Sequence, residues 1–336
     1  MKAIVVHFEA EKPVLKWETV DDIGYEPHEV LVHVRATAVN RADLSQARGH
    51  YPPPPGASEI LGLEMAGEIA AIGDAVAGWA VGDRVCALLS GGGYAEKAAV
   101  PADMLVRMPD EWSFTTAAAV MEVWLTAFSN LFMEGDLKPD ETILIHAGAS
   151  GVGTSAIQLA RHIGAAVYVT AGSERKRARC RELGAALAVN YKEADFSTAV
   201  MEASGGRGVD LILDPVGGPY LHQNLKVLRA GGRLVNIGLL GGTKGEMDMG
   251  LLLGNSMRLI GSRLRSRPLS QKIAIARNFE KTFWPLLISG VFWPLLISGV
   301  LKPEIDSVYS ITEAQAAHEH VARNRNLGKV ILKVDR

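Results

Sequence analysis

The feature that most constrains the fold is an apolar segment that runs into closely spaced glycines and then into a helical pattern. Residues 142–147 have the composition of a buried strand, and helical periodicity follows over 154–163. Between them stand Gly148, Gly151 and Gly153, a G-x-x-G-x-G variant of the commoner G-x-G-x-x-G spacing. Such glycines permit a tight turn and close approach of backbone to a pyrophosphate, whose charge is favoured at a helix N-terminus. The motif predicts a dinucleotide site, the alternative being an ordinary strand-to-helix turn.

Around this motif, short apolar runs alternate with helical segments, which predicts a parallel sheet with helices on both faces. The expected strands are 142–147, 166–170, 186–190, 209–214, 233–238 and 258–262, and the clearest helices are 156–163, 174–183 and 220–228. We therefore expect an α/β protein with a doubly wound sheet.

Residues 1–120 have a different pattern, of short apolar runs such as 2–7 and 30–39 separated by turn signals. The pairs Gly73-Asp74 and Gly82-Asp83 predict two hairpins. A helix is expected after about residue 116, capped by Thr115-Thr116, and a last strand over 329–334. The N-terminal part is therefore expected to be a β-rich domain.

Charge and cysteine content exclude several classes of protein. Lys plus Arg number 35 and Asp plus Glu 37, a formal net charge of −2, which gives no electrostatic reason to expect nucleic acid or an anionic membrane as a partner. The two cysteines, Cys86 and Cys180, are too few for a disulfide framework or a zinc site built on three or four thiolates. The first residues lack the apolar stretch of a secretory signal, so a cytoplasmic location is expected.

Residues 283–300 contain the nine-residue sequence FWPLLISGV twice in tandem. The segment carries no charge, but each copy contains a proline and a glycine, which break helices in water, so a membrane span is not expected. Nine residues advance a helix by about two and a half turns, so in one continuous helix the copies would face opposite sides. We expect a break near Ser289-Gly290, with one copy packed as a helix end.

The second expected strand bears on the choice of cofactor. An NAD site usually has an acidic residue at the end of this strand, bonded to the ribose 2′-hydroxyl. Here Ser173 follows the strand, Glu174 begins the next helix as a favourable first-turn charge, and basic residues including Lys176 come next. A cationic cluster suits the 2′-phosphate of NADPH, the alternative being a solvated helix face. The sequence predicts NADPH, with Ser173 and Lys176 as phosphate ligands.

Taken together, several motifs resemble those of the medium-chain dehydrogenase/reductase superfamily, and within it the zinc-independent quinone oxidoreductase (zeta-crystallin) branch, nearest to its stress-inducible NADPH quinone oxidoreductase group. The resemblance covers nearly the whole chain. It is carried by NRADL at 40–44, Tyr51 ahead of four prolines, LGLEMAG at 61–67, GDRV at 82–85, GGYAE at 92–96, WLTA at 124–127, the 148–153 loop with Gln158, and LGK at 327–329. Met121, where that group often has proline, and the 283–300 repeat depart from the pattern.

The resemblance implies a Rossmann domain inserted in a GroES-like domain, with the active site in the cleft between them and a homodimer formed through the edge strand near 259–264. The corresponding boundaries are a catalytic domain at 1–122, a cofactor domain at 123–264 and a return to the catalytic domain at 265–336.

The resemblance also assigns roles to residues. Tyr51 steers or protonates the acceptor, the alternative being a loop tyrosine that covers the cleft, and Asn40 and Asp43 order the nicotinamide side, unless Asp43 only caps the following helix. Arg263 and Arg265 lie near the cleft or on the surface. The expected cofactor contacts are Thr126, Ser150, Gly151, Val152, Gly153, Ser173, Lys176, Tyr191, Gly238, Leu239 and Leu240.

A catalytic zinc is not expected. Zinc-dependent relatives use a Cys, a Gly-His-Glu motif and a second Cys or acid, whereas here Asn40 takes the first position and Leu63 replaces the histidine. Leucine offers no lone pair to a metal. Without a Lewis acid, the acceptor itself has to delocalise the negative charge that hydride delivery creates, as quinones and conjugated enones do. The sequence predicts an NADPH-dependent reductase of these small molecules. The alternatives are an enone or enoyl-thioester reductase and a non-catalytic NADPH-binding structural or sensor protein.

Overall fold

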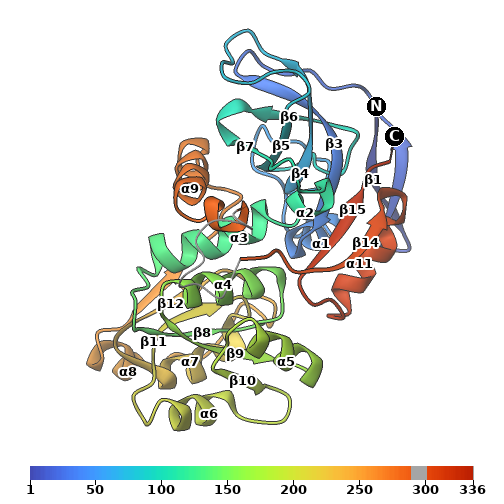
Figure 1. Ribbon diagram of the computed structural model, residues 1–336. Coiled ribbons are helices and arrows are strands. Elements are labelled where there is room, and N and C mark those ends of the chain that lie inside the picture. The colour runs from blue at the N-terminus through green and yellow to red at the C-terminus, as the bar shows by residue number, and fades with distance from the viewer. Residues whose placement is uncertain (289–300, 336) are drawn as a thin grey trace. The chain divides into compact units, whose positions relative to one another are not determined.

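The computed structural model describes residues 1–288 and 301–335, which form two compact units (Figure 1). One unit comprises residues 1–125, 264–288 and 302–335. The other comprises Thr126–Arg263. Each unit has its own sheet and its own buried apolar residues.

The first unit is built on a seven-stranded sheet of order β14-β15-β3-β4-β5-β7, with β6 paired to β3, beside an antiparallel β1-β2 hairpin. All its pairs are antiparallel except β14 with β15, and β15 pairs with β3, so the end of the chain lies against an early strand. The strands are Lys2–Glu9 (β1), Lys12–Thr19 (β2), Glu29–Val39 (β3), Glu64–Ile72 (β4), Arg84–Leu88 (β5), Lys97–Pro101 (β6), Leu105–Arg107 (β7), Ile305–Ser310 (β14) and Lys329–Lys333 (β15).

Helices of the first unit come from three parts of the chain. They are α1 (Arg41–Ala47), α2 (Phe114–Ala117), α3 (Met121–Phe128, which continues into the second unit), α9 (Leu269–Thr282), α10 (Trp284–Ile288) and α11 (Ala314–Ala322), with short 3₁₀ turns at Ala102–Met104 and Ile311–Glu313. Phe279 of α9 packs against Trp284, whose ring also lies 5.4 Å from that of Trp112.

The second unit is a six-stranded parallel sheet of order β10-β9-β8-β11-β12-β13. The strand order reverses between β8 and β11, and ligands of such sheets bind at the carboxyl ends of the strands at this switch point. The strands are Thr142–Ile145 (β8), Ala166–Ala171 (β9), Leu187–Asn190 (β10), Val209–Asp214 (β11), Leu228–Asn236 (β12) and Arg258–Gly261 (β13). The doubly wound sheet predicted from the alternation of strands and helices is confirmed.

Helices connect these strands. They are a π-helical turn at Ser129–Glu134, α4 (Gly151–His162), α5 (Glu174–Glu182), α6 (Phe196–Ala203), α7 (Leu221–Val227), preceded by a 3₁₀ turn at Gly218–Tyr220, and α8 (Met249–Gly254). One apolar cluster joins β8, β11 and β12 to α6 and α7, and includes Leu144, Phe196, Ile212 and Leu225. Burial of these side chains fixes the sheet that positions the loops described below.

Two local predictions were wrong. Both Gly-Asp pairs lie in the single connection between the antiparallel strands β4 and β5, so they mark the two ends of one hairpin loop and not two hairpins. Asp83 accepts a hydrogen bond from the Ala80 N–H and closes a turn inside that loop. The cap before α2 is Ser113, whose Oγ accepts from the Thr116 N–H, and not Thr115-Thr116.

The helical run Phe114–Glu134 is, within the described chain, long and apolar enough to cross a membrane, and 78% of its most apolar window is buried in the fold. Burial in a protein core accounts for such a composition. In the tandem repeat, Phe283, Trp284 and Leu287 of the first copy are buried. The break predicted near Ser289-Gly290 lies outside the described residues.

Candidate active site

The turn from β8 into α4 presents backbone donors at the switch point of the sheet. Ser150 is the N-cap of α4, and its Oγ accepts from the Gly153 N–H at 3.0 Å. The N–H groups of Gly151 and Val152 donate no hydrogen bond to any described residue. A Cβ on Gly153 would lie 2.5 Å from the carbonyl oxygens of Ala147 and Gly148, so the loop closes only around glycine. The turn therefore fits a pyrophosphate held by the positive end of a 12-residue helix.

The end of β9 carries the residues predicted to bind the 2′-phosphate. Ser173 is the N-cap of α5, and its Oγ accepts from the Lys176 N–H at 3.4 Å, which leaves its hydroxyl hydrogen for a further acceptor. A Cβ on Gly172 would lie 2.8 Å from the Tyr191 hydroxyl oxygen, so Tyr191 packs directly on this loop. Glu174 pairs with Arg181 at 2.9 Å and with Arg177. Ser173, Lys176 and Tyr191 therefore belong to one surface, at which Glu174 neutralises part of the basic cluster.

The loop after β12 contains the residues that are predicted to lie beside the nicotinamide ring. Leu239 and Leu240 are half-exposed, at 52% and 53%, in the loop that follows Gly238. The Leu240 N–H donates to the Pro215 carbonyl at 3.0 Å, which joins this loop to the one after β11 at the carboxyl edge of the sheet. Thr126, at the start of the unit, is buried, and its carbonyl accepts from Asn130 Nδ2 at 2.7 Å.

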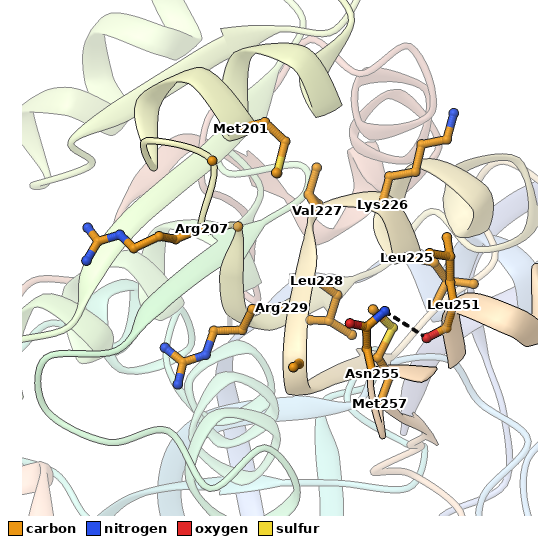
Figure 2. A pocket seen from close by; sticks show the side chains of 13 residues that line it. Met201, Arg207, Leu225, Lys226, Val227, Leu228, Arg229, Leu251, Asn255 and Met257 are labelled. Atoms are coloured by element: carbon orange, nitrogen blue, oxygen red, sulfur yellow. Dashed lines mark hydrogen bonds between the residues drawn. The ribbon is translucent and has the colours of Figure 1, made fainter. Parts of the chain in front are cut away.

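The same unit contains a cavity of about 240 Å³, whose lining includes Met201, Leu228 and Met257 (Figure 2). Gly208, which precedes β11, and Leu228, which begins β12, line it together with Met257. Because all strands of the sheet are parallel, their amino ends lie away from the α4 turn, and this cavity is not part of the candidate site.

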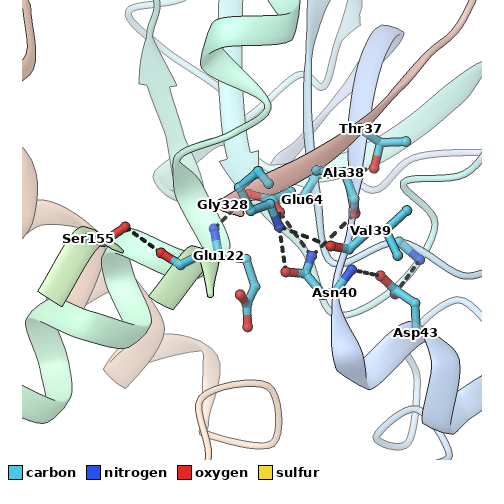
Figure 3. Close-up of polar contacts among 12 residues, drawn as sticks. Thr37, Ala38, Val39, Asn40, Asp43, Glu64, Glu122, Ser155 and Gly328 are labelled. Atoms are coloured by element: carbon cyan, nitrogen blue, oxygen red, sulfur yellow. Dashed lines mark hydrogen bonds and ion pairs between the residues drawn. The ribbon is translucent and has the colours of Figure 1, made fainter. Parts of the chain in front are cut away.

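In the other unit, Asn40 and Glu64 lie side by side (Figure 3). Both accept hydrogen bonds from the ammonium group of Lys329. Lys329 Nζ donates to Glu64 Oε1 at 2.7 Å, to Asn40 Oδ1 at 2.6 Å and to the Val39 carbonyl at 3.3 Å, which uses all three of its protons. Asn40 Nδ2 donates to Glu64 Oε1 at 2.9 Å, and the Glu122 N–H donates to Glu64 Oε2 at 2.9 Å. The Lys329 and Glu64 side chains are 3% and 0% exposed. The cluster is a buried, fully hydrogen-bonded ion pair.

These residues do not fit a zinc ion. The Asn40 and Glu64 oxygens accept hydrogen bonds from the Lys329 ammonium group, and Leu63, which is 3% exposed, offers no ligand atom. A divalent cation at these oxygens would also have to displace or deprotonate the ammonium group. Within residues 1–288 and 301–335, no group of three or more His, Cys, Asp or Glu side chains has a geometry able to hold a metal.

Asp43 lies in a second buried network beside this cluster. Its carboxylate accepts from the Asn40 N–H at 2.7 Å, which forms the capping box of α1, and from the Gly62 N–H at 3.1 Å. Tyr94 Oη lies 3.3 Å from Asp43 Oδ2 and 3.1 Å from His318 Nε2. Burial raises the pKa of Asp43 to about 6 and lowers the pKa of His318 to about 3. The capping role of Asp43 is therefore visible in the structure, and its catalytic role stays a prediction.

Tyr51 is in contact with Arg265, a residue that the sequence analysis could place either near the cleft or on the surface. The Arg265 guanidinium stands 5.3 Å from the centroid of the Tyr51 ring and donates to the Tyr51 carbonyl at 3.3 Å. Arg265 is only 5% exposed and is no surface residue. Sequence reasoning missed Lys329, Tyr94 and His318 as members of the buried networks. The motifs LGK and GGYAE contain two of them, but no spacing signals a contact across 289 residues, as between Asn40 and Lys329.

Two family models match the chain. Residues 26–110 match the alcohol dehydrogenase GroES-like domain, and residues 151–279 match the zinc-binding dehydrogenase model. Quinone oxidoreductase of Salmonella typhimurium is 33% identical over 322 residues, which are 94% of this chain and 94% of that protein. The chain belongs to the quinone oxidoreductase type of the medium-chain dehydrogenase/reductase family. The resemblance recognised in its motifs is thereby confirmed.

Solved structures of quinone oxidoreductase and of an enoyl reductase share the fold of this chain. The crystal structure of Escherichia coli quinone oxidoreductase complexed with NADPH has a TM-score of 0.85 at 28% identity and covers 99% of both chains. That of CurK enoyl reductase has a TM-score of 0.84 at 27% identity, also over 99% of both. The predicted combination of a Rossmann sheet and a GroES-like domain is confirmed.

This quinone oxidoreductase-type chain also matches parts of much larger proteins. It is 40% identical over 223 residues, 66% of its length, to the pikromycin polyketide synthase component PikAII of Streptomyces venezuelae. The match spans only 6% of that synthase component. The activity of the whole synthase is therefore no guide to the activity of this chain.

Proposed function

We propose that this chain is an NADPH-dependent reductase, of the NADPH:quinone oxidoreductase kind (EC 1.6.5 type), that delivers hydride to a quinone or related conjugated carbonyl without a metal. The Lys329 cluster carries the proposal. In this cluster the oxygens of Asn40 and Glu64 accept hydrogen bonds from an ammonium group, so they are not available as ligands of a metal. A metal held there would be the Lewis acid that the reduction of an isolated carbonyl needs. The acceptor then has to spread the developing negative charge over its own conjugated system.

The α4 turn supports the choice of a dinucleotide. Bound NADPH supplies the hydride. The Gly151 and Val152 N–H groups would hold its pyrophosphate, and Ser173 and Lys176 its 2′-phosphate. Thr126, Tyr191 and the 238–240 loop complete the proposed cofactor contacts. E. coli quinone oxidoreductase, which was solved with NADPH, has the same fold over 99% of this chain.

Residues of the first unit are proposed to act on the acceptor. Tyr51 would orient the acceptor oxygen or give it a proton, and Asn40, held by Lys329 and Glu64, would keep its position without a metal. Such positioning, with exclusion of water, accounts for most of the acceleration that a hydride transfer between bound partners needs.

A second function has a specific observation in its favour. CurK enoyl reductase shares the fold at 27% identity, so a 2-enoyl thioester is the alternative acceptor. A non-catalytic NADPH-binding protein is the third possibility, and it would bind cofactor without turnover.

The test is NADPH oxidation followed at 340 nm with 1,2-naphthoquinone or with a 2-enoyl thioester, before and after exhaustive chelation. We expect turnover of the quinone, faster than of the thioester, at a rate that chelation leaves unchanged. Preference for the thioester would establish the second function. Thermal stabilisation by NADPH with no turnover of either acceptor would establish the third. Loss of activity on chelation would refute a metal-free reaction.

Assembly and location are also proposals. Strand β13 is an edge of its sheet, so a second copy can extend the sheet there and form the homodimer that the family resemblance implies. We further propose a cytoplasmic location and the domain division at 1–122, 123–264 and 265–336. Both thiols, Cys86 and Cys180, are free and buried, as a reducing compartment allows.

A further inference from the structure

Two buried cations of the first unit converge on one serine. Arg265 Nε donates to the Ser90 carbonyl at 2.8 Å, and Lys272 Nζ donates to Ser90 Oγ at 2.6 Å. Arg265 is 5% exposed and Lys272, in the first turns of α9, is 9% exposed. The two positive charges therefore lie close together in a largely desolvated place.

The acceptors around these cations are neutral. Apart from Ser90, Arg265 donates to the Tyr51 carbonyl at 3.3 Å and to Gln46 Oε1 at 2.7 Å. Lys272 has Ser90 Oγ as its hydrogen-bond acceptor among the described residues, so two of its three protons remain available. Neither cation forms an ion pair within the described chain. The Asp43 charge reaches Arg265, but that carboxylate is already bonded to two backbone N–H groups.

Such an arrangement is electrostatically unfavourable without an anion. Burial lowers the pKa of Arg265, and burial together with the Arg265 charge lowers the pKa of Lys272. Lys329, in the same unit, shows the alternative, since its ammonium group is also buried but is paired with Glu64. Lys272 has no ion-pair partner among the described residues, lies close to Arg265 and has N–H groups available for further hydrogen bonds. These properties favour the binding of an anionic ligand.

We propose that Arg265, Lys272 and Ser90 form an anion subsite beside Tyr51, so that the preferred acceptor is a conjugated carbonyl compound bearing an acidic group such as a carboxylate, sulfonate or phosphate. The inference rests on the proposed reductase function, because Tyr51 is there the residue that orients the acceptor. The Arg265 guanidinium contacts the Tyr51 ring and carbonyl, and an anionic substituent held by Lys272 fixes the acceptor relative to this tyrosine.

The experiment compares two acceptors, neutral 1,2-naphthoquinone and 1,2-naphthoquinone-4-sulfonate, by their kcat/KM with NADPH. The two quinones differ in reduction potential, so the informative quantity is the change in the sulfonate-to-neutral ratio between variants. A charge-assisted hydrogen bond in a desolvated site contributes enough for Lys272→Met to lower this ratio by roughly tenfold or more. Lys272→Arg, which keeps the charge, retains most of the ratio.

The matched control is Lys281→Met, an exposed lysine near the end of the same helix, which keeps the wild-type ratio. An unchanged ratio in Lys272→Met overturns the anion subsite, while the proposed function survives if the neutral quinone is still reduced. Failure of the wild type to reduce either quinone refutes the proposed function instead.

A second measurement needs no variant at all. We expect 2-naphthalenesulfonate to inhibit wild-type reduction of the neutral quinone at concentrations at least about tenfold lower than its uncharged near-isostere 2-naphthalenesulfonamide. Equal inhibition by the two compounds overturns the subsite even if Lys272→Met fails to fold.

Discussion

In the unit Thr126–Arg263, the proposed pyrophosphate site consists of backbone N–H groups, supplied by consecutive residues at the start of α4. In the other unit the buried polar clusters consist of charged side chains that come from distant parts of the sequence. Lys329 lies 265 residues from Glu64, and Arg265 lies 175 residues from Ser90. The α4 turn depends on local conformation and has no room for a Cβ at Gly153, whereas the clusters of the other unit depend on whether each buried charge has a partner.

This difference predicts how each region responds to substitution. Changes in the α4 turn should affect cofactor affinity with little effect on the rest of the fold. Changes in the paired cluster should affect stability first, because a charge left alone in a protein interior destabilises the whole unit.

The largest expected effect is that of Lys329→Met. It leaves Glu64 buried without its counter-charge and should lower the free energy of unfolding by about 3–5 kcal/mol, measured by urea denaturation. Lys329→Met/Glu64→Gln removes both charges and should recover a substantial part of that loss. Lys333→Met, at an exposed position of the same strand, should change stability by at most about 0.5 kcal/mol. Equal stability of the Lys329 and Lys333 variants would show that the pair contributes nothing.

Acidification should reveal the neighbouring buried network. The pKa of His318 is about 3 in the folded chain, below its ordinary value of 6.5, so between these values the unfolded chain binds the extra proton. Stability from this group is present above pH 6.5 and is lost as the pH falls. The difference in unfolding free energy between wild type and His318→Gln should shrink by about 1.4 kcal/mol per pH unit from roughly pH 6 to 4. A constant difference for His318→Gln would contradict its burial in the neutral form.

The α4 turn is tested by Gly153→Ala. The new Cβ would lie 2.5 Å from two carbonyl oxygens, so the turn has to open and NADPH affinity should fall at least about tenfold, measured by fluorescence titration. Gly254→Ala, at the end of α8 with no atom within 4 Å of the added carbon, should bind NADPH like wild type. Equal affinity of the two variants would remove the α4 turn from the cofactor site.

The smallest predicted effect sharpens the choice of cofactor. Lys176→Glu should weaken NADPH roughly tenfold more than NADH, because only NADPH carries the 2′-phosphate that a carboxylate repels. Both dissociation constants can be measured by calorimetry with the same preparation. An equal loss for NADPH and NADH would show that Lys176 does not contact the 2′-phosphate.

The sequence correctly predicted those parts of the fold that depend on patterns within a few consecutive residues. Strand β11 was predicted with its observed ends, and the turn into α4 was predicted as a cofactor site, since hydrophobic period and glycine spacing act within a few residues. The two Gly-Asp pairs belong to one hairpin and not to two, because Asp83 closes a turn within the longer loop between β4 and β5, a contact that the dipeptide does not encode. Arg265 remained undecided between cleft and surface, because burial of a charged residue depends on which loops surround it.

By itself the sequence determined the parallel sheet, the glycine-lined turn at its switch point and the loss of the zinc-ligand pattern at Asn40 and Leu63. All three features follow from residues that are close together in the sequence. Only the tertiary structure decided which buried charges are paired. Glu64 pairs with Lys329 because β15 lies beside β3 in the sheet. Arg265 and Lys272 both donate hydrogen bonds to Ser90 and have no acidic partner among the described residues. The energy of a charge depends on its distance to others and on its burial, and both are set only once the chain is folded.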